Sequence, residues 1–94
     1  MITIVYYDEY DSKYSEKSGE FDEAISDSAI LTVTEDLNDS FDAVEKHQND
    51  NKDSEIDYNF EFWRGGERFA SICVVAPIRE CIDDIKQHLQ SFLH

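Results

Sequence analysis

Residues 56–75, IDYNFEFWRGGERFASICVV, predict a β-hairpin. Residues 56–63 alternate as a strand does, with one apolar face and one mixed face. The apolar face carries Tyr58, Phe60 and Phe62, and the mixed face carries Asp57, Asn59, Glu61 and Trp63. Gly65 and Gly66 supply the positive φ angles of a tight turn. Residues 67–75 return as a strand, and because the run 72–75 is apolar on both faces, it favours a central position in a sheet.

Helical periodicity lies on both sides of this hairpin. After Pro77, which suits a first helical turn, the apolar residues Ile78, Ile82, Ile85, Leu89 and Phe92 recur at helical spacing. Before the hairpin, Leu37, Phe41 and Val44 form a narrower stripe that Thr34 or Asp36 can cap. The run 49–54 consists of turn-forming residues and predicts a loop.

The N-terminal third predicts two further strands, over residues 2–7 and 29–34, where β-branched and aromatic residues gather. Serines, Gly19 and closely spaced acids fill residues 8–28, which we expect to form a loop with at most one short strand or helical turn. The element order predicts an α+β fold: one small domain over residues 1–94, with a mostly antiparallel sheet of about four strands and two main helices packed on it.

The charge of the chain is concentrated in its first two thirds. Residues 1–61 hold eighteen of the twenty-two acidic residues and only four lysines, whereas residues 62–94 hold four acids and four bases. The whole net charge of −14 therefore comes from residues 1–61. Solubility of a small domain needs a net charge of only about 2–8, and further repulsion costs stability. This asymmetry favours a function for the acidic surface.

The chain lacks the apolar run of about 20 residues that a membrane span needs, and its N-terminus has no basic region or cleavage-site pattern. We therefore expect a cytoplasmic protein without a membrane partner. Cys73 and Cys81 fall on plausible core faces of a strand and a helix. They are expected to be buried, reduced thiols.

No constellation of residues predicts catalysis, so we expect a protein that is not an enzyme and holds no cofactor or metal. His47, His88 and His94 lack the spacing of paired ligands on one helix face. Asn49, Asn51 and Asp53 match the first ligand positions of a calcium loop. However, Ser54 occupies the position of the required glycine and Phe60 that of the closing glutamate.

A folded surface of carboxylates can occupy a cationic site that otherwise binds DNA, since proteins bind duplex DNA largely through its phosphates. The more ordinary interpretation is that a run of charge is only a solvated face. The candidate partner-binding residues come from the 8–28 segment, the first helix and the strand over 56–63. They are Asp8, Glu9, Asp11, Glu16, Glu20, Asp22, Glu23, Asp39, Asp42, Glu45, Asp57 and Glu61.

The chain resembles the small anti-restriction DNA-mimic proteins of T-even bacteriophages. The resemblance rests on size, on dispersed acids, and on the segments MITIVY (1–6), FDAVEK (41–46) and FWRGGERF (62–69). It implies a homodimer whose acidic face imitates DNA in a bacterial host. The implied target is a modification-dependent restriction nuclease of the McrBC type or a histone-like nucleoid protein such as H-NS. No residue-level contacts carry over.

Two other functions fit the same residues: an immunity or antitoxin protein that blocks one cognate basic nuclease through a local hot spot, and an acidic adaptor with no cationic partner. A domain of this charge is not expected to bind nucleic acid itself. For a dimer, the stripe of the last helix (Ile78, Cys81, Ile82, Ile85, Leu89, Phe92, Leu93) is wide enough to serve both a core and a partner, and Trp63 could join it. Closure of one small core accounts for these residues equally well.

Overall fold

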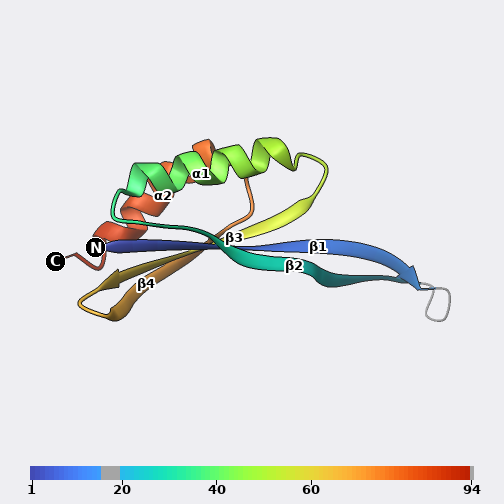
Figure 1. Cartoon of the computed structure of the whole chain (residues 1–94), viewed down its shortest axis with the longest axis horizontal. Helices are drawn as coiled ribbons and strands as arrows, with labels where there is room; N and C mark the ends of the chain where they lie inside the picture. Colours follow the sequence, from blue (N-terminus) through green and yellow to red (C-terminus); the bar gives the residue numbers. More distant parts are fainter. Residues whose placement is uncertain (16–19, 94) are drawn as a thin grey trace.

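The structure is a computed structural model that describes residues 1–15 and 20–93. The elements follow in the order β1 (Ile2–Ser15), β2 (Glu20–Thr34), α1 (Leu37–Asp50), β3 (Glu55–Arg64), β4 (Glu67–Val74) and α2 (Ile78–Gln90). The four strands form one antiparallel sheet in the order β2-β1-β3-β4. The predicted α+β class, with two helices on a four-stranded sheet, is confirmed (Figure 1).

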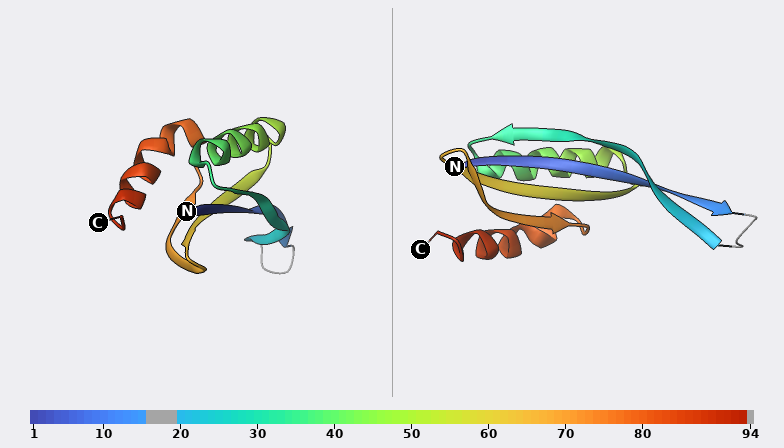
Figure 2. Two further views of the ribbon diagram at one scale, coloured as in Figure 1. Left: turned by 60° about the vertical axis from the view of Figure 1, so that its left-hand side comes forward. Right: turned by 90° about the horizontal axis from the view of Figure 1, so that it is seen from below.

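The core lies between one face of the sheet and the two helices. Cross-strand register aligns Val5 with Phe60 and Phe62 with Ala70 on this face, and all four side chains are buried. Phe41 and Val44 of α1 and Ile78, Ile85 and Leu89 of α2 complete the core. Both helices lie on the same side of the sheet (Figure 2). The predicted apolar face of β3 is confirmed, since Tyr58, Phe60 and Phe62 are each almost wholly buried.

The expectation of a loop over residues 8–28 was wrong. β1 continues to Ser15 and β2 begins at Glu20, and the two pair continuously from Thr3–Thr34 to Ser15–Glu20. Ser26 and Leu31 are the extra residues at two irregularities in this pairing. Cross-strand pairing outweighs the weak strand propensity of serine and acidic residues here, because propensity in a sheet depends on context. Residues 16–19 lie outside the described residues.

The predicted central position of residues 67–75 was also wrong, because β4 is an edge strand and the centre belongs to β1 and β3. Cys73 consequently faces away from the helices and is exposed, contrary to its expected burial. Cys81 is partly buried, and both thiols are free. The hairpin turn is confirmed, with φ of 58° at Gly65 and 79° at Gly66.

The helix ends follow the local sequence. The Asp36 carboxylate accepts a hydrogen bond from the Asn38 amide (2.9 Å), so Asp36 caps α1, as one of the two predicted candidates. Pro77 immediately precedes α2, whose apolar stripe mainly closes the core: Ile78, Ile85 and Leu89 are buried. Only its C-terminal continuation, Phe92 and Leu93, is exposed. Within residues 1–15 and 20–93, neither helix has the length and apolar character that a membrane crossing requires.

Candidate interaction surface

The acidic hairpin, defined as residues 8–15 and 20–28, projects beyond the rest of the sheet (Figure 1). β3 pairs with β1 only as far as Tyr10, so β1 and β2 continue past that point as a two-stranded ribbon. The molecule is accordingly elongated, with extents of 52 × 25 × 21 Å. Of the predicted site residues, the hairpin holds Asp8, Glu9, Asp11, Glu20, Asp22 and Glu23, while Glu16 lies outside the described residues.

Strand register brings the hairpin acids close together. Glu9 lies directly opposite Asp27, and Asp8 lies between Ser28 of β2 and Asp57 of β3. Like charges in directly opposed positions destabilise a sheet. Hydrogen bonds offset part of this cost: the Ser28 hydroxyl donates to Asp8 Oδ1 (2.6 Å), and the Tyr7 hydroxyl donates to Asp27 Oδ2 (2.8 Å). The latter bond raises the pKa of Tyr7.

The charge density of the hairpin is close to that of one DNA strand. Residues 8–15 and 20–28 contain seven acidic residues. At a rise of about 3.4 Å per residue, the eight residues of β1 concerned span about 27 Å, which gives one carboxylate per about 4 Å. A single strand of B-DNA carries one phosphate per about 3.4 Å of axis. Lys13, which lies opposite Asp22 in the register, lowers the net density slightly.

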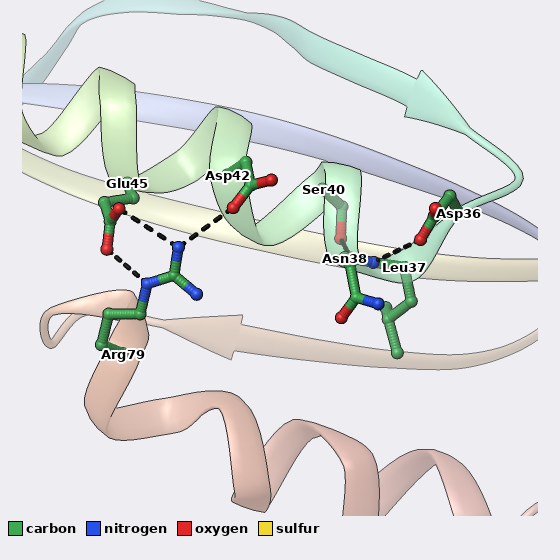
Figure 3. Close-up of polar contacts among 7 residues, drawn as sticks. All are labelled: Asp36, Leu37, Asn38, Ser40, Asp42, Glu45 and Arg79. Atoms are coloured by element: carbon green, nitrogen blue, oxygen red, sulfur yellow. Dashed lines mark hydrogen bonds and ion pairs between the residues drawn. The ribbon is translucent and has the colours of Figure 1, made fainter.

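Three predicted site residues outside the hairpin form ion pairs: Asp42 and Glu45 of α1, and Glu61 of β3. The Arg79 guanidinium of α2 binds both Glu45 and Asp42 of α1, with Nη2 at 3.0 Å from Asp42 Oδ1 and at 3.2 Å from Glu45 Oε1 (Figure 3). The hydrogen bond from Arg79 lowers the pKa of Glu45. Of the three predicted site residues on α1, Asp39 is exposed, whereas Asp42 and Glu45 share one cation.

The two predicted site residues on β3, Asp57 and Glu61, differ in whether they form an ion pair. Glu61 forms an ion pair with Arg68 (2.9 Å) and accepts the Trp63 indole N–H at 3.2 Å. Partial burial raises the pKa of Glu61, but the hydrogen bonds from Arg68, Trp63 and Tyr6 outweigh it and lower the pKa. Asp57 forms none of the ion pairs found in the described parts of the chain.

The sheet face that the helices leave uncovered, here called the open sheet face, carries exposed apolar residues that sequence reasoning did not single out. The register places three apolar residues of β2 on this face, since each lies opposite a β1 residue of the same face: Val33 opposite Ile4, Ile30 opposite Tyr6 and Ile25 opposite Tyr10. They are 58%, 57% and 56% exposed. Clustered exposed apolar side chains mark interaction surfaces in soluble proteins. The alternation Ile25…Ile30…Val33 was obscured by the extra residues Ser26 and Leu31.

Two histidines of the described segments lie within hydrogen-bond distance of neighbouring groups. His47 Nδ1 lies 2.8 Å from the buried hydroxyl of Tyr58, and burial raises the pKa of Tyr58 to about 12. His88 Nε2 lies 2.9 Å from the Ser71 carbonyl oxygen, on the edge strand. No group of three or more His, Cys, Asp and Glu residues that could hold a metal occurs within 1–15 and 20–93.

Comparisons of this chain with protein-family models, with curated proteins and with solved structures found no match.

Proposed function

We propose that the protein is a DNA mimic that inhibits a DNA-binding protein or nuclease by occupying its cationic groove with the acidic hairpin. The observation that carries the proposal is the charge spacing along the hairpin, close to that of a DNA strand. Paired strands hold these carboxylates on a folded scaffold, so that binding avoids the ordering entropy that a disordered acidic tail loses. The protein would act in the cytoplasm, by binding alone, without catalysis or cofactor.

The contact surface in this proposal is narrower than the full acidic surface. It consists of the hairpin acids with Asp39 and Asp57, and leaves out Asp42, Glu45 and Glu61, which bind Arg79 and Arg68. From the resemblance to phage anti-restriction proteins, the targets to test first are a McrBC-type nuclease and an H-NS-type nucleoid protein.

We further propose that a second copy of the chain covers part of the open sheet face. β1 pairs with both neighbours over Thr3–Tyr10, about 27 Å, and four strands are about 19 Å wide, so this face offers at most about 500 Å². That is smaller than the ~800 Å² per partner of a standard interface, so the dimer would be a weak one. The apolar residues Val33 and Ile30 would be removed from water. Two hairpins in one dimer would also bring the charge density closer to that of a duplex.

Displacement of DNA from each candidate target tests the proposed function. Increasing amounts of the protein are added to a preformed complex of the target with duplex DNA, and released duplex is followed by gel shift. We expect release at low salt, weakening steeply as salt rises, because ion pairs dominate the contact. Release insensitive to salt would favour an immunity-type hot spot. Direct binding of duplex by the protein alone would contradict the proposal.

A further inference from the structure

A pocket of about 600 Å³ lies where three segments meet: the end of α1 with the loop after it, the start of β3, and the connection from β4 to α2. Its volume is within the range of small-ligand sites. Tyr10 of β1 also lines it. Most of the acidic hairpin lies outside this pocket, and of the described residues that line it, Asp57 alone belongs to the contact surface proposed above.

Side-chain hydrogen bonds hold the walls of the pocket in place. The Gln48 amide nitrogen donates to the Ala76 carbonyl oxygen (3.0 Å), and the Gln48 amide oxygen accepts the Ile78 backbone N–H at 2.9 Å. The Asn51 side chain donates to the His47 carbonyl oxygen (2.9 Å). α1, its loop and the start of α2 are thereby fixed to one another, so a ligand would meet a preformed site, which lowers the entropic cost of binding.

The lining combines negative charge, an aromatic ring and an apolar wall. Glu55 and Asp57 contribute carboxylates, and neither forms an ion pair within the described residues. The Tyr10 hydroxyl lies close to the Asp57 carboxylate: desolvation, followed by the Asp57 and Asp8 carboxylates, raises the pKa of this hydroxyl. Ile56, Pro77 and Val75, the last 72% exposed, form the apolar part. Among the described residues of the lining, Lys52 is the one cationic side chain.

This combination selects among ligand classes. An anion would meet two carboxylates, and an uncharged apolar ligand would desolvate them without compensation. A divalent metal would need more ligands than the described acids and histidines bring together here. A guanidinium group fits best, because it is planar, weakly hydrated, able to stack on a tyrosine ring and able to donate to two carboxylates at once. A lysine ammonium is strongly hydrated and stacks less well.

We propose that this pocket binds an arginine side chain presented by a basic partner protein. The guanidinium lies against Tyr10 and donates to Asp57 and Glu55 at the edge of β3 that β4 leaves unpaired, while the aliphatic stem packs on Val75 and Pro77. Arginine is among the residues that most often anchor protein interfaces. Binding of an arginine side chain by this pocket does not depend on the proposed function. The identity of the partner protein that presents the arginine does rest on the proposed function.

The test is an NMR titration of the whole ¹⁵N-labelled chain with Nα-acetyl-arginine amide, alongside Nα-acetyl-lysine amide at matched ionic strength. We expect saturable shifts at the amides of Gln48, Asp57 and Val75, with a Kd of roughly 1–10 mM for a ligand this small. The lysine probe should bind several-fold more weakly. Asp57→Asn should weaken arginine binding about fivefold. The matched control is Asp83→Asn, which removes an exposed carboxylate of α2 outside the pocket and should leave the Kd unchanged.

Shifts that spread over all acidic elements without saturating, an unchanged Kd in Asp57→Asn, or no binding of the arginine probe would each overturn the proposal. Because Asp57→Asn keeps the size of the side chain, its spectrum also reports whether the fold is intact. The result does not depend on DNA displacement. If the protein binds the arginine probe but releases no DNA, the proposal of an arginine-binding pocket stands and the proposed DNA-mimic function is contradicted.

Discussion

Asp8 and Asp57 lie directly opposite each other on the central strands β1 and β3, on the open sheet face. Both are partly buried, and the neighbouring hydrogen bonds come from Ser28 and, at 3.5 Å, from Asn59 to Asp8. A sheet selected for stability alone would not oppose two carboxylates at its centre. The placement is consistent with a surface that holds negative charge at a cost in folding free energy.

Substitution of one member should therefore stabilise the protein. We expect Asp57→Asn to raise the free energy of unfolding by about 0.5–1 kcal/mol at low salt, because it removes an opposed like-charge pair. The gain should shrink as salt screens the repulsion. Urea denaturation at two salt concentrations measures it. Asp42→Asn is the control of opposite sign, since it removes an ion pair with Arg79. Equal shifts in both variants would show that only the net charge matters.

In the described part of the core, a buried polar atom of Thr3 costs stability. Thr3 is wholly buried between sheet and helices, and its hydroxyl oxygen has no hydrogen-bond partner in the described residues. Thr3→Val keeps the shape of the side chain and removes the unsatisfied group, so the free energy of unfolding should rise by about 1 kcal/mol. Thr34→Val is the matched control: the Thr34 hydroxyl accepts the Asp36 N–H (3.1 Å), so this variant should be less stable than the wild type. A destabilised Thr3→Val would contradict this account of the core.

The ion pair between α1 and α2 predicts a pH dependence. Arg79 lowers the pKa of Glu45 below its ordinary value of 4.5, so the folded state favours the ionised carboxylate. The resulting stabilisation is fully present above the unfolded-state pKa and is lost as pH falls through the lower folded-state pKa. Glu45→Gln should be less stable than the wild type at pH 7, and the two should converge as pH falls through the lowered folded-state pKa. A difference that persists unchanged into acid would rule out the pair as its source.

The proposed dimer predicts a salt dependence opposite to that of target binding. Screening reduces the repulsion between two copies that each carry −14, so sedimentation velocity should show dimerisation strengthening as salt rises. Ile30→Ser removes an exposed apolar side chain from the open sheet face and should shift the equilibrium to monomer. Leu93→Ser, which changes an exposed apolar residue beyond α2, is the control. A monomer at all salt concentrations, or equal loss in both variants, would argue against this interface.

The sequence was most informative where burial imposes a period. The alternation of Tyr58, Phe60 and Phe62 and the spacing of Ile78, Ile85 and Leu89 predicted β3 and α2, because those side chains all face one core. The hairpin beyond Tyr10 has no such constraint, since it pairs only with itself, and its acids and serines were interpreted as a loop. Strand order was equally inaccessible, because it depends on which edges pair. Without the strand order, the sequence analysis placed β4 at the centre of the sheet and Cys73 in the core.

The site was predicted in composition but not in arrangement. The acids of residues 8–23 were recognised as candidates, yet their assembly into the projecting acidic hairpin depends on the register of β1 and β2. The pairing of Arg79 with Asp42 and Glu45 joins residues more than thirty positions apart, and no local pattern indicates it.

Position of charge, rather than its amount, is the central claim, and two triple variants with equal net charge test it directly. Glu20→Gln/Asp22→Asn/Glu23→Gln neutralises the hairpin, and Glu80→Gln/Asp83→Asn/Asp84→Asn neutralises the same number of carboxylates on α2. Competition with labelled duplex for an H-NS-type or McrBC-type protein is followed by fluorescence anisotropy. The hairpin variant should need about tenfold more protein for half-displacement, and the α2 variant no more than about twofold. Equal losses in the two variants would contradict the claim that the hairpin occupies the DNA site.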